Sequence, residues 1–437
     1  YLKRQYPLGK ADLYAAFLLR GLELVGDGGV SSMLTMRNWM FIKQYAELRQ
    51  HLLGTFDLIS LHDLSSGAFE EISAAQVVVS VTTSIFRRSQ GDATAVAIKA
   101  FNDETVTQVG ETLRKRAATL CHVGRHEFDP VALKVVPEWP LVYWWDASFL
   151  DEYAKVEKFG DRDPVRIGMK TSNNTRYVRF TFEIASSSAS FATFSEPIPK
   201  WADWVPYVQG AMGRAWIDPA REMVRWVNGG IQIKLSLQKA YGMGPQSESR
   251  YFQPGVACST IGSEFRVRLH RFRSIFSTGG TSAFPTNRES AVCLLNSSIA
   301  RSVVQSLNPS VNFEVGDINR VPAWEIEGYD EITKGLEAAF AIHESYREPS
   351  IEFQHPGPSQ WRQAQEWAQI AVDRPEGTPL PDYVEELDPE PPTDHLSFAL
   401  GVVLGRFGPN GEGILDPSQD DLAHALPGGI LFLDGTL

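Results

Sequence analysis

The feature that most constrains the fold is the alternation of helical and strand-like patterns along the first hundred residues. Apolar side chains recur at helical spacing in two runs, each ended by glycine, and β-branched residues dominate four other runs. The predicted helices are 10–25 and 39–53, and the predicted strands are 30–36, 56–61, 76–86 and 93–100. The first of these strands is expected to be buried, and the last two to form an antiparallel hairpin at a sheet edge. This order is typical of the second half of a doubly wound α/β sheet.

From Pro137 onward the sequence changes to a dense mixture of aromatic and polar residues. Strand-like runs at 176–184 and 231–237, and a helical run at 294–307, predict a separate mixed α+β domain. A later stretch rich in Pro and acidic residues, 348–394, predicts a linker around one short helix at 359–371. The predicted domains are therefore 1–136, 137–325 and 326–437.

Charge is distributed unevenly over the 437 residues. Residues 161–320 carry 19 basic and 12 acidic side chains, whereas residues 321–437 carry 5 basic and 22 acidic ones. A basic middle inside an acidic chain is expected if that segment faces a polyanion. The alternative is an ordinary fluctuation of charge along the chain, which the composition does not exclude.

Composition and motifs exclude several classes of protein. With 43% hydrophobic and 22% charged residues the chain can bury a core, so it is neither a disordered chain nor a collagen. Three cysteines give no disulfide framework, and no apolar run is long enough for a membrane helix, so we expect a cytoplasmic protein. Phosphate-binding and nucleophile-elbow motifs are absent. Cys121, His122 and His126 cluster without a zinc-site spacing and are more simply a surface loop.

A set of short blocks resembles the BREX-type, PglX-like family of adenine-specific N6 DNA methyltransferases. Each block is weak alone, but their order and spacing are specific and cover most of the chain. The blocks include Tyr6–Phe17, Gly28–Val30, Leu34–Phe41, Gly67–Phe69, Tyr143–Trp144, Gly168–Asn174, Trp204–Gly210, Tyr251–Val256, Leu295–Ser297, Leu307–Pro322 and Phe398–Gly401.

The resemblance implies a fold, a cofactor and partners. The fold would be the C-terminal half of a Rossmann-like class I methyltransferase sheet, followed by a target-recognition domain. The cofactor would be S-adenosylmethionine, and the partners double-stranded DNA and other BREX proteins. The family's Phe-x-Gly-x-Gly methyl-donor turn and its Asn-Pro-Pro-Tyr loop are absent from the sequence. We therefore expect a fragment of a longer protein that does not methylate DNA alone, an expectation that both chain ends also suggest.

Within this resemblance, the first helix is expected to lie beside the methyl-donor pocket. Asp12, Tyr14 and Phe17 are the candidate cofactor-binding residues. The alternatives are core packing for Phe17, as for Leu13, and a favourable helix-dipole charge for Asp12.

Two residues at the end of a predicted strand, Arg37 and Asn38, are candidate DNA contacts, because such sheets bind ligands at that edge. An N-cap role for Asn38 is the alternative.

The basic middle region supplies the remaining candidate DNA contacts. Arg and Lys position a protein on phosphates, and Arg, Asn and Gln read bases in the major groove. The loop candidates are Lys170, Asn173, Asn174 and Arg176. The candidates in the alternating run are Arg266, Arg268, Arg271 and Arg273, with Arg266 and Arg268 on one strand face. The alternative for this run is an ordinary half-solvated strand.

Two other functions remain open from the sequence. The first is a fused type II restriction–modification enzyme whose nuclease lies outside these residues. The second is a non-catalytic DNA-recognition or scaffold subunit of a defence complex, in which the acidic C-terminal region would dock a partner.

Overall fold

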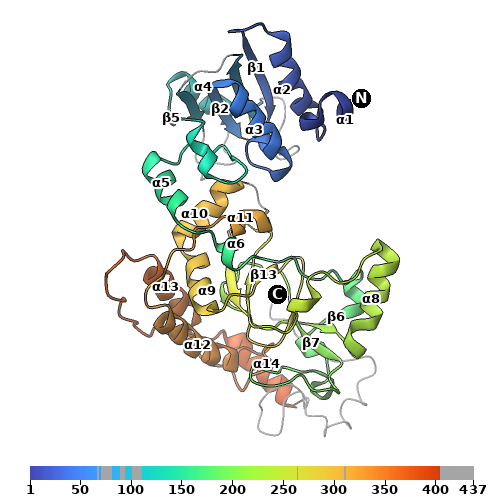
Figure 1. Cartoon of the computed structure of the whole chain (residues 1–437). Coiled ribbons are helices and arrows are strands. Elements are labelled where there is room, and N and C mark those ends of the chain that lie inside the picture. The colour runs from blue at the N-terminus through green and yellow to red at the C-terminus, as the bar shows by residue number, and fades with distance from the viewer. Residues whose placement is uncertain are drawn as a thin grey trace. The chain divides into compact units, whose positions relative to one another are not determined.

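The protein is described from a computed structural model that covers residues 1–65, 68–69, 81–88, 94–100, 111–262, 264–309 and 312–403. Its chain divides into two compact units (Figure 1). The N-terminal unit comprises Tyr1–Glu157 and Ser306–Pro309, and the C-terminal unit comprises Lys158–Gln305 and the chain from Ser310 onward. The functional boundaries predicted at 136 and 325 stay predictions.

In the described part of the N-terminal unit, five strands form one mixed sheet in the order β1-β3-β2-β4-β5. The strands are β1 (Val30–Met36), β2 (Asp57–Ser65), β3 (Val81–Arg87), β4 (Ala95–Lys99) and β5 (Arg125–Phe128). β3 runs antiparallel to both β1 and β2, and β2 runs parallel to β4. The predicted hairpin is therefore wrong, because β3 lies between β1 and β2 and β4 pairs on the other side of β2. Residues 76–80 of that prediction lie outside the described residues.

Helices and 3₁₀ turns complete the described part of this unit and correct one detail of the sequence analysis. They are α1 (Leu2–Gln5), α2 (Leu13–Leu24), α3 (Ala46–Thr55), α4 (Glu111–Leu120) and α5 (Ala147–Lys155), with 3₁₀ turns η1 (Pro7–Gly9), η2 (Arg37–Met40), η3 (Lys43–Tyr45) and η4 (Ala132–Val135). The helix predicted from residue 39 begins at Ala46, because η2 and η3 first turn the chain away from β1.

The predicted apolar face of α2 is also wrong, although the helix itself is confirmed. Leu13 and Phe17 are exposed, with 60% and 56% of their surfaces accessible, and Ala15, Leu18 and Leu22 are buried instead. The expected buried strand β1 is an edge strand whose Val30 and Leu34 are exposed.

Two four-stranded sheets form the middle of the C-terminal unit, in the orders β13-β10-β11-β8 and β12-β7-β9-β6. The strands are β6 (Val178–Phe180), β7 (Trp204–Val208), β8 (Trp216–Ile217), β9 (Glu222–Arg225), β10 (Val256–Cys258), β11 (Val267–Leu269), β12 (Ile275–Phe276) and β13 (Ser282–Ala283). A core of Met169, Tyr207, Val224, Ile233 and Phe276 and their neighbours joins them.

Helices complete the described part of this unit. They are α6 (Phe159–Arg162), α7 (Asn174–Tyr177), α8 (Val227–Tyr241), α9 (Arg288–Asn296), α10 (Ser298–Leu307), α11 (Val315–Asn319), α12 (Tyr329–Tyr346), α13 (Trp361–Val372) and α14 (Pro392–Val403), with 3₁₀ turns η5 (Thr181–Glu183), η6 (Ser186–Ser188) and η7 (Glu248–Arg250). Among the described helices, none is long and apolar enough to cross a membrane.

Three expectations for this unit change. The run 231–237 is helical in α8, because Ile233 and Leu237, four residues apart, are the buried pair. The run 176–184 contains only the short strand β6. The helix predicted over 294–307 breaks at Ser297, where the carboxylate of Asp373 accepts hydrogen bonds from the Ser298 N–H and hydroxyl, both at 2.6 Å.

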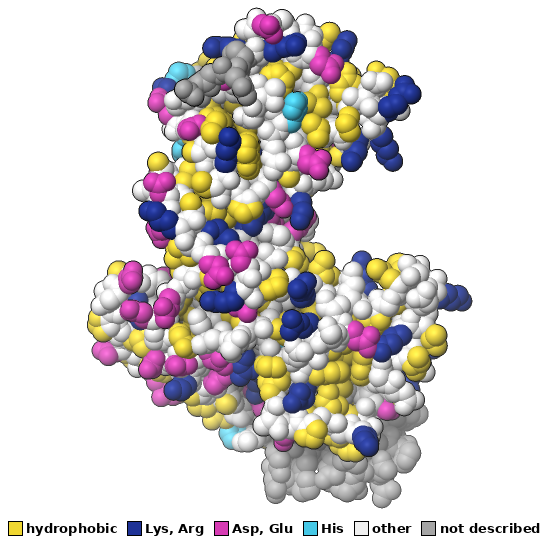
Figure 2. All heavy atoms as spheres, in the orientation of Figure 1, with side chains coloured by type: hydrophobic (Ala, Val, Ile, Leu, Met, Phe, Trp, Pro, Cys, Tyr) yellow, Lys and Arg dark blue, Asp and Glu magenta, His cyan; other side chains and the backbone are white. Residues whose placement is uncertain are grey.

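The stretch predicted as a linker is packed onto the C-terminal unit. The short helix predicted there is confirmed as α13, and it packs along α12, with the Phe340 and Trp361 rings 4.8 Å apart. The Phe353 side chain is buried, and Ser359 pairs with Asp388 through two backbone hydrogen bonds. Figure 2 shows acidic side chains gathered over α12 and α13.

Candidate functional sites

The carboxyl ends of the parallel strands of the N-terminal unit meet at one edge of its sheet. The register pairs Thr35 of β1 with Thr82 of β3, Thr82 with Asp63 of β2, and Asp63 with Lys99 of β4. Directly paired residues share a face, so four polar side chains cross the sheet in one row. The first three are buried. We call this row the polar edge row.

A buried ion pair fixes the turn that follows β1. Arg37 donates to Asp63 Oδ2 from Nε at 2.9 Å, and its Nη2 lies 2.7 Å from the same oxygen. The Tyr143 hydroxyl donates to Asp63 Oδ2 as well, at 3.0 Å. The second oxygen, Asp63 Oδ1, is buried and accepts no hydrogen bond from the described residues. Arg37 is therefore held inward by Asp63.

Asn38 lies beside this pair in η2 and is half-buried. Its carbonyl accepts hydrogen bonds from the Phe41 and Ile42 N–H groups. The N-cap of η2 is Met36, so the alternative of an N-cap role for Asn38 is wrong.

The three cofactor candidates lie on the first turns of α2. This helix precedes β1 and packs along it, with Gly21 against Ser31, so its N-terminus lies toward the carboxyl end of β1. Asp12 is the exposed N-cap residue and its side chain makes no capping hydrogen bond. Tyr14 is half-buried with its ring 5.7 Å from that of Tyr45, and burial raises its pKa well above the usual range. The structure thus brings Asp12 and Tyr14 toward the same sheet edge as Arg37, with the exposed Phe17 about one turn further along α2.

In the C-terminal unit, the predicted loop residues Lys170, Asn173, Asn174 and Arg176 are all exposed. The loop is ordered by its own amides. Asn173 Oδ1 accepts from the Arg176 N–H at 3.0 Å and so caps α7, and Asn174 Oδ1 accepts from the Thr171 hydroxyl. The Arg176 guanidinium lies 5.2 Å from the Tyr177 ring centroid. The loop therefore presents two cations from a fixed backbone.

The alternating arginine run was interpreted either as a set of DNA contacts or as a half-solvated strand, and its structure agrees with neither. β11 is an inner strand between β10 and β8, and all three of its residues are buried. Arg268 is 1% exposed, and its guanidinium pairs with Asp218 at 3.1 Å and donates to the Gln209 carbonyl. The strand is thus not half-solvated, and the guanidinium of Arg268, predicted to contact DNA, is buried and bound within the chain.

The other arginines of this run are also engaged within the chain. Arg271 donates to both carboxylate oxygens of Glu352 at 2.8 Å, and Arg266 pairs with Glu264. Arg273 donates to the carbonyls of Phe194, Glu196 and Phe252. The contacts of Arg271 and Arg273 join segments that are distant in sequence, whereas the pair of Arg266 and Glu264 is local.

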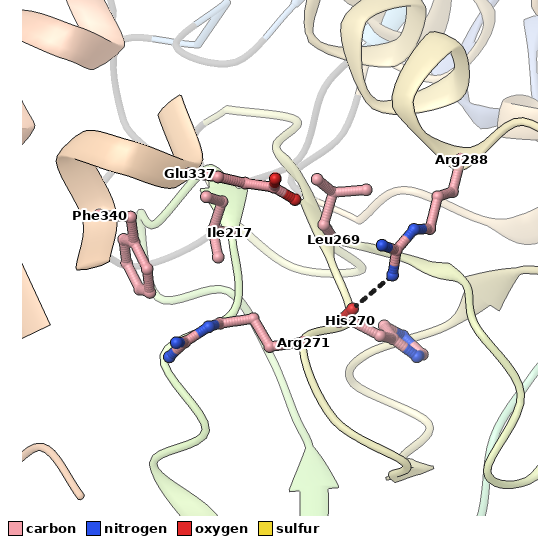
Figure 3. A pocket seen from close by; sticks show the side chains of 7 residues that line it. All are labelled: Ile217, Leu269, His270, Arg271, Arg288, Glu337 and Phe340. Carbon is pink, nitrogen blue, oxygen red and sulfur yellow. Dashed lines mark hydrogen bonds between the residues drawn. The ribbon is translucent and has the colours of Figure 1, made fainter. Parts of the chain in front are cut away.

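A small cavity of about 210 Å³ lies beside β11 (Figure 3). The Arg271 guanidinium lies 5.0 Å from the centroids of both the Phe272 and Phe340 rings, and Arg288 donates to the His270 carbonyl at 3.1 Å. Burial lowers the pKa of His270 to about 4, so its imidazole is neutral at pH 7. Sequence reasoning missed this cavity because its lining comes from β8, β11, α9 and α12.

Sequence reasoning also missed Asp63 and its partner Tyr143 as a buried centre. The available signal was an acidic residue near the end of a strand otherwise rich in apolar side chains. In the part of the chain that the structure describes, no group of three or more His, Cys, Asp or Glu side chains could hold a metal ion.

Comparisons with known proteins agree with the sequence resemblance. A family model described as Eco57I restriction-modification methylase matches residues 1–69. The chain is 25% identical over 332 residues to the adenine-specific methyltransferase PglX of Lacticaseibacillus casei (strain Zhang), covering 74% of this chain and 27% of that protein. It is 23% identical over 342 residues to the adenine-specific methyltransferase BrxX of Escherichia coli O9:H4 (strain HS), covering 76% and 27%. The resemblance to PglX-like methyltransferases is confirmed, and the chain spans about a quarter of these relatives' length.

The chain is also similar to solved structures of restriction–modification enzymes. The type IIL enzyme MmeI in complex with DNA gives a TM-score of 0.48 at 12% identity and covers 84% of this chain and 50% of its own. A nuclease-deletion mutant of the type ISP enzyme LlaGI with a DNA substrate mimic gives 0.45 at 10% identity, covering 77% and 32%.

Proposed function

We propose that this chain is part of an adenine-N6 DNA methyltransferase that acts in BREX phage defence in the cytoplasm. It would supply the second half of the methyltransferase sheet and the DNA-recognition domain, within the predicted boundaries 1–136, 137–325 and 326–437. Its cofactor would be S-adenosylmethionine, and its partners double-stranded DNA and other BREX proteins. The observation that carries the proposal is the 25% identity over 332 residues with PglX, a protein named as an adenine-specific methyltransferase.

The N-terminal sheet supports the catalytic half of this proposal. β1 and β2 run in the same direction, because both are antiparallel to β3, and α3 connects them. Such α/β sheets bind ligands beyond the carboxyl ends of their parallel strands. The candidate residues of α2 and the polar edge row lie at that edge. This arrangement fits a Rossmann-like half sheet in which β3 is inserted antiparallel.

The residues at this edge fit a methyl donor that carries an aromatic base and a charged amino acid. The exposed Phe17 ring offers a stacking surface. The Asp12 carboxylate makes no capping hydrogen bond and so offers an acceptor for ribose hydroxyls or an amine. When bound, S-adenosylmethionine supplies an electrophilic methyl group. Tyr14 is a neutral phenol at physiological pH, as burial raises its already high pKa further, and it would serve as a hydrogen-bonding group and an aromatic wall.

The ion pair between Arg37 and Asp63 would fix the backbone beside the expected binding site of the target adenine. Methylation at adenine N6 requires the base to leave the stack and enter a pocket. The pair fixes η2, which directly follows β1 and carries Asn38. Arg37 would thus position the turn, and Asn38 would contact the extruded base or the backbone beside it.

The exposed loop of the C-terminal unit supports the DNA-reading half. Lys170 and Arg176 would lie against phosphates, and Asn173 and Asn174 would read base edges with the amide atoms that the loop leaves unused. Because phosphate contacts release counterions, binding should weaken as salt rises.

The test is methyl transfer by the polypeptide encoded in the complete open reading frame. Purified protein, S-adenosylmethionine and unmethylated DNA are incubated, and digested nucleosides are analysed by mass spectrometry. We expect N6-methyladenine, and its loss in Asp12→Ala together with weaker binding of S-adenosylmethionine. DNA that gains methylcytosine, or stays unmodified while the protein binds both ligands, would overturn the proposal.

A fused restriction–modification enzyme is the second candidate, favoured by the description of the family matched at residues 1–69. Cleavage of unmethylated DNA by the same purified polypeptide would support it. A non-catalytic recognition or scaffold subunit would instead bind DNA without methylating or cutting it.

A further inference from the structure

The loop between β7 and β9 contains an unusual concentration of left-handed backbone. Met212, Gly213, Trp216 and Ala220 have φ values of 49°, 82°, 70° and 49°. Strained backbone persists where the surrounding structure enforces it, and it clusters at functional sites. Trp216 and Ala220 are buried and so are held by packing, but the Met212 side chain is 76% exposed. The loop therefore presents an apolar side chain to solvent at a strained tip.

Arg214 and Arg221 lie in this loop, and Arg268 lies on β11 opposite Trp216 of β8; among the described residues only Arg268 of these three has an ionic partner. Arg268 is neutralised by Asp218, as described above. Arg214 and Arg221 form no ion pair with the described residues, and the buried Arg214 Nε–H donates no hydrogen bond to them. Burial lowers the pKa of Arg214, and the nearby charges of Arg221 and Arg268 lower it further. Like charges are thus held together in a partly desolvated place.

The neighbouring acidic side chains do not cancel the positive charge of these arginines. The cluster holds Arg214, Arg221 and Arg268 against Asp218 and Glu222, so it is net positive when all are charged. Burial raises the pKa of Glu222 and so disfavours its ionised, negatively charged form. An anion placed between Arg214 and Arg221 would satisfy the idle donors and relieve the repulsion.

The second arginine is held in place by an aromatic surface. The Arg221 guanidinium carbon lies 5.5 Å from the centroid of the Phe180 ring, which stacks on Phe182 at 5.2 Å. Phe180 is 36% exposed, so the arginine lies over a ring at the surface. Arg221 is therefore pre-oriented without being neutralised, which suits a group that meets a ligand.

We propose that Arg214 and Arg221 jointly bind one backbone phosphate of duplex DNA, and that Met212 packs against the adjoining sugar or base step. This inference deepens the proposed function and rests on it for the identity of the partner. An exposed methionine beside cations suits a duplex, because DNA-binding proteins insert such apolar side chains at base steps next to basic phosphate contacts. None of these three residues was singled out by the sequence analysis.

The test measures binding of the 437-residue chain to a fluorescently labelled 30-base-pair duplex across a range of salt concentrations. Arg214→Gln and Arg221→Gln should each weaken binding about tenfold but change the slope of log affinity against log salt little, because the remaining arginine still neutralises the shared phosphate. The double variant should lose about 0.9 in slope and not twice that value, because both residues share one phosphate. Met212→Ala should weaken binding without changing the slope.

Matched controls separate this inference from a general loss of charge or of fold. Lys334→Gln removes an exposed cation from α12, and Met243→Ala removes another exposed methionine. Both should bind like the parent chain, and thermal melts should show that all variants fold. An unchanged slope and affinity in the double arginine variant, with salt-dependent binding by the parent, would overturn this inference alone. A parent chain that binds no duplex at low salt would overturn both this inference and the DNA-binding half of the proposed function.

Discussion

The ion pair between Arg37 and Asp63 allows a quantitative prediction for the substitution Asp63→Asn. The asparagine has the same shape and can still accept a hydrogen bond from Arg37, so the change removes charge and little else. Asp63 is fully buried, Arg37 is 6% exposed, and Tyr143 donates to the same carboxylate. The variant therefore removes the carboxylate charge that lies 2.7 Å from the buried Arg37 guanidinium.

The expected cost follows from burial. Removing one partner of a buried ion pair typically costs about 3 to 5 kcal/mol, because the remaining charge loses its counterion in a poorly solvated place. For a unit of this size about 1 kcal/mol changes the melting temperature by about 2 to 4 °C. We expect the N-terminal unit to melt about 6 to 20 °C lower in Asp63→Asn. The pair of the exposed Lys43 and the half-buried Glu138 supplies the control, and Lys43→Met should cost under about 1 kcal/mol.

Calorimetry gives the melting transitions, and hydrogen exchange of peptides from β2 and β3 identifies which one belongs to this unit. Removing both charges with Arg37→Met and Asp63→Leu together should cost clearly less than the two single changes added. A change in melting temperature below about 2 °C for Asp63→Asn, or strict additivity in the double variant, would refute the reasoning.

Three further predictions concern titration, reactivity and helix capping. The folded-state pKa of His270, about 4, lies below its ordinary value of 6.5, so stability should fall by about 3 kcal/mol as pH drops from 6.5 to 4, and denaturant melts of His270→Gln should lose that pH dependence. Burial raises the pKa of the Cys258 and Cys293 thiols to about 12, whereas Cys121 is exposed, so mass spectrometry after iodoacetamide treatment of the native chain should find label on Cys121 alone. Asp373→Ala removes the carboxylate at the start of α10 and should cost about 0.5 to 2 kcal/mol in the same melts, and an unchanged midpoint would exclude a capping role.

Local patterns in the sequence predicted the elements of the N-terminal unit but not how they pair. The helix over 10–25 and the strand over 30–36 are present at nearly the expected bounds. Alternation and β-branching mark a strand because they report on its own two faces. They contain no information on its neighbours, so the insertion of β3 between β1 and β2 could not be read from them.

The buried face of a helix could not be predicted from the sequence where apolar residues occur all around the helix axis. Leu13, Phe17, Leu18 and Leu22 of α2 are all apolar, and only packing against β1 decided which of them are buried. In α8, Ile231, Ile233, Leu235 and Leu237 alternate as in a strand, but a spacing of four residues also suits one face of a helix.

The sequence by itself determined the resemblance to PglX-like methyltransferases, the helices and strands with the clearest periodicity, and the exposed loop that carries Lys170 and Arg176. Only the tertiary structure decided which charges face solvent. Arg268 and Arg214 look alike in the sequence, yet Asp218 neutralises the first and leaves the second without an ionic partner among the described residues. Desolvation and pairing depend on side chains that are distant in sequence, and those distances exist only in the folded chain.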